Sequence, residues 1–208
     1  MIDQFAGWFR FGRLVDNRPQ ALSSWRVTTR TQESAAAVAR LFGGSPQHWQ
    51  TTSADHFEVL TDASNVRITL EGPHCITSDM RKWGHKGLVH HCDGQQFLSP
   101  HEMKGEPCGC PESAKDRKSW ARSRLGPQPN TEILFRIDKM PDLGDFRMHS
   151  ISWKFAESVA SALALMNSAQ SKLICGLSLT VAEFDVMAGH RTKYRQPLLL
   201  PDEVGEAT

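Results

Sequence analysis

The sequence carries regular apolar patterns on both sides of one long stretch that has none, and this interruption most constrains the fold. Strand and helix periods are visible up to residue 72 and again from residue 131. Between them, residues 73–130 are dominated by Gly, Pro, Cys, His and charged side chains. This insert cannot build a core from its own apolar residues, so we expect another source of stability.

The patterned flanks each predict strands around a helix. In the first flank, we expect a helix with Thr31 as N-cap, Glu33 in the first turn and Gly43 just past the end. The remaining expected elements are strands at residues 23–30, 56–62, 65–72, 131–138 and 146–152, a helix at 154–169, and a closing hairpin of 172–186 with 191–200.

We therefore predict an α+β protein with antiparallel sheet. Its two strand-helix-strand halves are residues 1–72 and 131–200, and a zinc-binding loop module at residues 73–130 interrupts them. The acidic residues 201–208 are expected to form a disordered tail.

Three cysteines of the insert predict a metal site. Cys108-Gly109-Cys110 places two thiols two residues apart on a loop, and Cys92 precedes them. Three thiolates favour an ion that accepts tetrahedral sulfur and nitrogen ligands, so Zn²⁺ is the expected cofactor. The competing interpretation is free loop thiols among solvated histidines.

The identity of the fourth ligand is more open. We favour His90, because His-x-Cys in an extended segment projects both side chains to one side. Its competitors are His85, His91, His101 and Cys75. Cys175 lies in an apolar run and is expected to be an ordinary core residue.

The composition is that of a globular protein, with 39% hydrophobic and 23% charged residues. No apolar run approaches the roughly 20 residues that span a bilayer, and the first residues lack the order of a signal peptide. We expect a cytoplasmic protein, in which a cysteine cluster more often binds metal than forms disulfides. A net charge of +1 argues against nucleic-acid binding through the overall field, although a local basic patch is compatible with it.

Catalysis is the less favoured interpretation of the cluster. Its likeness to the zinc deaminase pattern is superficial, because Glu102 directly follows His101 and the cysteines are spaced C-x-C. No H-E-x-x-H, G-x-S-x-G, P-loop or G-x-G-x-x-G motif occurs in the chain. Crowded thiols favour a closed structural site, so we expect no enzyme.

Several short blocks, in order over residues 18–200, resemble a known family. The blocks are "RPQALSSWRVTT", "VARLFGG", "HFEVLTD", "HHCDG", "PCGCP", "PNTEILFRI" and "MPDLGDFRMHS". They resemble the recombination directionality factors of actinobacterial temperate phages that use large serine integrases, and their prophage-encoded relatives.

The resemblance implies a protein that binds a serine integrase on its attachment-site DNA and biases recombination toward excision, with little DNA affinity of its own. It also implies a zinc site flanked by Cys-Asp-Gly and Cys-x-Cys-Pro. Family members carry two further cysteines where this chain has Leu88 and Pro127. Either the histidines at 85, 90 or 91 substitute for them, or the site has decayed and only the fold remains.

A subunit of a ribonucleoprotein is the alternative function. Two flanks of strands and a helix are similar to tandem ferredoxin-like RNA-binding domains, including the Repeat-Associated Mysterious Protein subunits of CRISPR effector complexes. Guide RNA and other subunits would then be the partners. Basic residues beside an aromatic one suit such a surface, although solvated faces are the simpler interpretation. The candidate nucleic-acid contacts are Arg117, Lys118, Arg122, Arg124, Arg191, Lys193 and Arg195.

Two tryptophans are candidate partner contacts. Trp83 lies within the irregular insert, and Trp120 lies among the first group of basic residues. Exposed tryptophans outside regular elements often contribute much of the binding energy of a protein interface.

Overall fold

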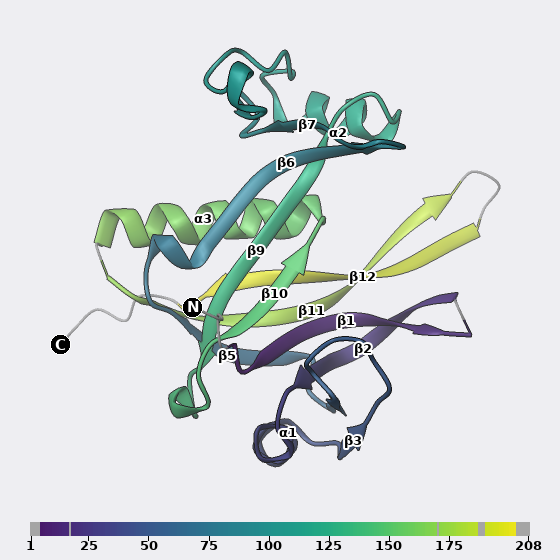
Figure 1. The fold of residues 1–208 in the computed structure, drawn as a ribbon, viewed down its shortest axis with the longest axis vertical. Coiled ribbons are helices and arrows are strands. Elements are labelled where there is room, and N and C mark those ends of the chain that lie inside the picture. Colours follow the sequence, from purple (N-terminus) through teal and green to yellow (C-terminus); the bar gives the residue numbers. More distant parts are fainter. Residues whose placement is uncertain (1–4, 17, 170, 187–189, 203–208) are drawn as a thin grey trace.

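The structure, a computed structural model, is a mixed α+β fold (Figure 1). It describes residues 5–16, 18–169, 171–186 and 190–202, except for the side chains of residues 182–193. The helices are α1 (Gln32–Phe42), α2 (Ala114–Arg122) and α3 (Trp153–Ala169), with 3-10 turns at Pro73–Cys75, His101–Met103 and Pro141–Leu143. The strands are β1 (Gly7–Val15), β2 (Arg18–Thr29), β3 (Pro46–His48), β4 (Phe57–Leu60), β5 (Asn65–Leu70), β6 (Ile76–Gly84), β7 (Gly87–Cys92), β8 (Phe97–Ser99), β9 (Gln128–Ile137), β10 (Phe146–Ser150), β11 (Leu173–Val186) and β12 (His190–Pro201).

The strands of the described residues form one 12-stranded sheet. Its main path runs β12-β11-β5-β9-β10-β1-β2-β4-β3, and β6, β7 and β8 branch from β9. The branch arises because β9 is long enough to have two neighbours along one edge. Its residues 128–133 pair with β6, whereas Arg136 and Ile137 pair with β5.

Strands that precede the insert in the sequence lie between and beside strands that follow it. β5 lies between β11 and β9, and β1 lies beside β10. The α+β class is as predicted, and the described strands pair antiparallel, as expected, except for the parallel pair of β1 and β10. Local periodicity specifies that a segment is a strand and not which strand lies beside it. The division into halves at residues 72, 130 and 200 stays a prediction.

The insert contains more regular structure than its sequence pattern predicts. β6, β7, β8 and α2 all lie within residues 73–130. β6 gains its order from backbone pairing with β9, in which Ile76 lies opposite Ile133. β1, which the sequence analysis did not predict, likewise depends on its neighbours β2 and β10. Long-range pairing therefore supplies order that the local sequence does not signal.

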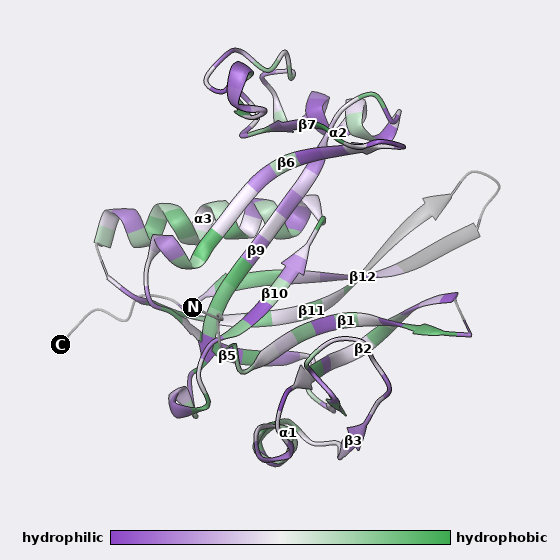
Figure 2. Ribbon diagram, viewed as in Figure 1, coloured by the Kyte–Doolittle hydropathy of each residue, from purple (hydrophilic) through white to green (hydrophobic). Residues whose placement is uncertain are grey.

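The core is centred on Phe9 of β1. Its ring makes edge-on contacts with Phe135 and Phe146, with centroids 5.2 and 5.5 Å apart, and with Trp25 at 5.8 Å. α3 adds a buried stripe at helical spacing, made of Phe155, Val159, Ala162 and Met166. Hydrophobic residues concentrate on α3 and the central strands, whereas the module around β7 is mostly hydrophilic (Figure 2).

The predicted limits of α1 are confirmed. The Thr31 Oγ1 accepts a hydrogen bond from the Ser34 N–H at 3.1 Å. At the other end, the Gly43 N–H donates to the Ala39 carbonyl at 2.9 Å, and Gly43 has φ of 77°, which favours glycine. Short-range capping chemistry is therefore enough to place this helix.

The closing hairpin is confirmed as the antiparallel pair β11–β12. The turn at residues 187–189, and residues 203–208 of the predicted tail, lie outside the described residues. Among the described helices, none is both long and apolar enough to cross a membrane.

Candidate metal centre

Four side chains of the insert converge on one point. Two come from β7 and two from the loop before α2: His90, Cys92, Cys108 and Cys110. Their ligand atoms all lie within 4.8 Å of one another. The Cys92 and Cys110 sulfurs are 3.7 Å apart, and the His90 Nε2 lies 3.6 Å from the Cys110 sulfur and 3.1 Å from the Cys92 sulfur.

Two of these three separations suit a tetrahedral zinc ion, and the His90–Cys92 separation of 3.1 Å is shorter than the ideal value. Zn–S bonds of about 2.3 Å in a tetrahedron place the sulfurs about 3.8 Å apart, and a shorter Zn–N bond brings nitrogen and sulfur to about 3.6 Å. The Cys92–Cys110 and His90–Cys110 separations match these values. The donor set, one imidazole and three thiols, is a common one for structural zinc.

Strand geometry explains why His90 and Cys92 reach the same point. Alternate residues of a strand lie on one face, so these two side chains project together from β7 while His91 points to the other face. β7 is itself held by antiparallel pairing with β6, in which Cys92 lies opposite Met80. Met80, Cys92 and Cys108 form a small buried cluster against which Trp153 packs.

The loop that carries Cys108 and Cys110 is shaped by local hydrogen bonds. The Cys108 N–H donates to the Gln95 carbonyl at 2.9 Å, which brings the loop back beside the end of β7. Asp93 closes the turn after β7, because its carboxylate accepts from the Gln95 and Gln96 N–H groups at 2.8 and 2.7 Å. Gly109, with φ of 71°, permits the reversal between the two cysteines.

Arg117 of α2 links the two loops of the centre. Its Nη1 donates to the Gly94 carbonyl at 3.3 Å and to the Pro111 carbonyl at 3.2 Å. Gly94 follows the end of β7 and Pro111 follows Cys110. Burial and the hydrogen bond with Cys108 raise the pKa of Cys110, and the charge of Arg117 opposes this shift. Arg117 therefore serves the fold of the module directly.

The surroundings of the cluster shift the pKa values of Cys92, Cys110 and His90. Burial raises the pKa of Cys92, and Cys110 adds to this shift although the Gly94 N–H opposes it. Burial, then the hydrogen bond with Cys108, raises the pKa of Cys110 to about 11. Burial, then the charges of Lys82 and His91, lowers the pKa of His90, so its imidazole is in the neutral, coordinating form near pH 7. A bound divalent ion would supply the charge that ionises the thiols.

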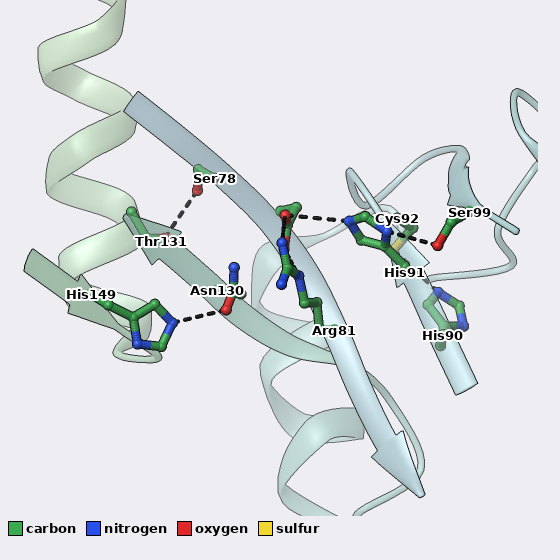
Figure 3. Close-up of polar contacts among 10 residues, drawn as sticks. Ser78, Arg81, His90, His91, Cys92, Ser99, Asn130, Thr131 and His149 are labelled. Atoms are coloured by element: carbon green, nitrogen blue, oxygen red, sulfur yellow. Dashed lines mark hydrogen bonds and ion pairs between the residues drawn. The ribbon is translucent and has the colours of Figure 1, made fainter. Parts of the chain in front are cut away.

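His91 anchors β7 from the opposite face (Figure 3). Its Nδ1 lies 2.8 Å from the Ser99 Oγ of β8, and its Nε2 lies 3.3 Å from the buried Asp79 carboxylate of β6. Asp79 also accepts hydrogen bonds from Arg81 at 2.8 and 2.7 Å. This polar network joins three strands and fixes the strand that carries His90 and Cys92.

Sequence reasoning found the four converging residues but missed this network. Asp79 and Ser99 carry no motif, and only their pairing positions beside β7 bring them to His91. Asp93 lies in the segment HHCDG that the sequence analysis singled out, but its role in closing the turn is visible only in the structure. Spacing along the chain can suggest ligands, whereas the groups that orient them come from other strands.

The other candidate ligands lie outside the cluster of four. His85 and His101 are exposed, and His91 is occupied by Asp79 and Ser99. Cys75 is buried, with its sulfur 3.6 Å from the His74 Nε2. Cys175 lies in the core, as expected, and burial raises its pKa to about 12.

The candidate nucleic-acid residues whose side chains the structure describes differ in burial and in their contacts. Arg117 is engaged within the module, Lys118 is half-buried, and Arg122 and Arg124 are exposed around the end of α2. Arg195 is half-buried on β12, and the side chains of Arg191 and Lys193 lie outside the described residues.

The two tryptophans differ in exposure. Trp83 is 66% exposed near the end of β6. Trp120 is half-buried on α2 and lies against Gly126, where an added Cβ would come within 2.5 Å of the indole. Trp83 therefore has the larger free surface.

One family model matches residues 6–200, described as Gp3-like, recombination directionality factor-like. The match extends over the whole fold described above. The chain belongs to this recombination directionality factor-like family. The resemblance that the ordered blocks indicate is thereby confirmed. No solved structure matches the chain significantly.

In this directionality factor-like chain, Leu88 and Pro127 occupy the two positions where family members were expected to carry cysteine. Leu88 is 39% exposed near the start of β7, and Pro127 is buried just before β9. His90 lies two residues after Leu88 on the same strand and completes a set of four with three cysteines. Of the two alternatives that the sequence left open, the geometry supports substitution by histidine.

Proposed function

We propose that this protein binds a serine integrase on its attachment-site DNA and biases site-specific recombination toward excision. The observation that carries the proposal is the family match over residues 6–200, which includes both the sheet and the metal module. In this role the protein is an accessory factor, and the chemistry of strand exchange belongs to the integrase.

The charge distribution supports action through a protein partner. The net charge is +1, and basic residues on the central strands are paired within the fold. Arg26 is paired with Glu58, Arg136 with Asp145 at 2.8 Å, and Arg147 with Glu132 at 3.7 Å. Cations neutralised in this way release few counterions from DNA, so binding to free nucleic acid should be weak.

We propose that His90, Cys92, Cys108 and Cys110 hold one Zn²⁺ with a structural role. The Cys92–Cys110 and His90–Cys110 separations and the buried thiols of Cys92 and Cys108 support this assignment. Four protein ligands leave no position for water or substrate, which agrees with a protein that is not an enzyme. The ion would join β7 to the 108–110 loop in a module that has few apolar contacts.

The ribonucleoprotein alternative gains no support from the fold. That hypothesis expects two separate ferredoxin-like halves, whereas strands from both flanks alternate in one sheet. Its phosphate contacts also include Arg117, whose guanidinium is engaged by backbone carbonyls.

A reconstituted recombination assay tests the proposed function. The purified chain is added to the large serine integrase encoded in the same genome, with DNA carrying either the two hybrid sites that flank an integrated element or the two original sites. We expect the chain to promote recombination between the hybrid sites and to inhibit it between the original sites. Equal rates with and without the chain on both substrates would refute the proposal.

A further inference from the structure

The tip of the β6–β7 hairpin, residues 82–89, carries exposed apolar side chains. Trp83, Leu88 and Val89 are 66%, 39% and 58% exposed. Trp83 and Leu88 are direct cross-strand partners, so their side chains are neighbours. Val89 lies against Gly84, where an added Cβ would come within 3.0 Å of the valine Cγ1. Adjacent exposed apolar side chains on a hydrophilic module mark an interaction surface.

Cations flank these apolar side chains, and acidic residues are absent from this part of the sequence. Residues 80–92 include Arg81, Lys82 and Lys86 but no Asp or Glu. The preceding Asp79 is buried and already paired with Arg81 and His91. Within the described residues, neither Lys82 nor Lys86 has an ion-pair partner. The tip therefore presents unneutralised positive charge beside an apolar centre.

The hairpin tip is also held in place. The Lys82 Nζ donates to the Leu125 carbonyl at 2.8 Å, which ties the hairpin to the turn after α2. The base of the hairpin is fixed by pairing with β9 and by the His91 network. Figure 1 shows the β6–β7 module at the end of the molecule opposite α1. A preorganised tip loses little conformational entropy when it binds.

We propose that the hairpin tip is the surface that docks onto the integrase, with the Trp83 indole entering an apolar pocket rimmed by carboxylates. This inference rests on the proposed function and adds the contact surface and the chemistry of its partner. Aliphatic side chains such as Leu88 and Val89 gain by burial against protein, whereas a DNA backbone offers them phosphate and sugar. The positive rim accelerates encounter with an acidic surface and sets its orientation.

The test measures binding of purified variants to the large serine integrase from the same genome, without DNA. Trp83→Ala should weaken affinity by about 30-fold or more, as expected for a central tryptophan. Leu88→Ser should also weaken it, and Leu165→Ser on α3 is the matched control, because both leucines are 39% exposed. Lys86→Glu, which leaves the Lys82–Leu125 contact intact, should slow association about 3-fold or more at low salt, with Lys104→Glu, elsewhere in the module, as its control.

The outcomes separate this inference from the proposed function. If the unmodified chain fails to bind the free integrase, this inference is refuted, whereas the recombination assay described above decides the proposed function. If it binds and the Trp83 and Leu88 variants bind equally well, the hairpin tip is not the contact, while the proposed function stands. If the charge-reversal variant instead loses salt-sensitive binding to DNA alone and keeps its affinity for the integrase, the tip is a DNA contact and the inference is wrong.

Discussion

Replacing Cys108 with serine should remove the metal and loosen one part of the fold. Cys108 is 6% exposed and is one of the four converging side chains of the candidate metal centre. A serine hydroxyl stays protonated near neutral pH and is a poor zinc ligand compared with a thiolate. Cys75→Ser is the matched control, because Cys75 is also 6% exposed but lies outside the cluster.

The size of the effect follows from what else holds the module together. The apolar side chains packed in the small cluster, Met80, Phe97 and Trp153, contribute about 1.5–3 kcal/mol each at full burial. A structural zinc ion contributes about 10–16 kcal/mol of apparent binding free energy at pH 7. The ion therefore outweighs the apolar contacts, and its loss should open the module. β6 and β9 should remain paired, because their backbone pairing over residues 76–81 and 128–133 does not include the four candidate ligands.

Native mass spectrometry and hydrogen exchange together check this prediction. We expect one zinc per unmodified chain and per Cys75→Ser chain, and none for Cys108→Ser or Cys110→Ser. Amides of residues 87–113 should lose at least about 1000-fold of their protection, since about 4 kcal/mol suffices for that change. Full metal retention in both ligand variants would refute the site. Exchange that rises uniformly over the whole chain after chelation would refute the separate dependence of the module on metal.

Three further predictions concern stability and nucleic acid. Asp79→Ala leaves Arg81 and His91 without their carboxylate and should lower the free energy of unfolding by about 1–3 kcal/mol in urea titration, whereas an unchanged midpoint would show that the network is dispensable. Phe9→Ala removes the ring at the centre of the aromatic core and should cost about 3–5 kcal/mol, which differential scanning calorimetry would detect as a lower Tm; an unchanged Tm would contradict its central place. Binding to free DNA or RNA should be weak, and its affinity should change little with salt concentration. Strong binding that falls steeply with salt would contradict this prediction if it is lost when four basic residues are changed to Ala: Arg117, Lys118, Arg122 and Arg124.

The elements that could be predicted from the sequence are those set by short-range interactions. α1 is an example, because Thr31 and Gly43 satisfy its terminal backbone groups within a few residues. The convergence of the four candidate ligands was also predictable, since alternation along β7 puts His90 and Cys92 on one face and the C-x-C loop provides two more donors. β1 and β6 were not, because their order depends on partners far away in the chain.

The sequence by itself determined the α+β class, the limits of α1 and three thiols of the candidate metal centre, because periodicity, capping and ligand chemistry act between residues that are close in the chain. Only the tertiary structure decided that β5 lies between β11 and β9, that β1 runs parallel to β10, and that His91 meets Asp79 and Ser99. Strand neighbours are chosen by how whole faces bury against one another, and no local pattern encodes that choice. The same pairing places Trp83 and Leu88 side by side at an exposed tip.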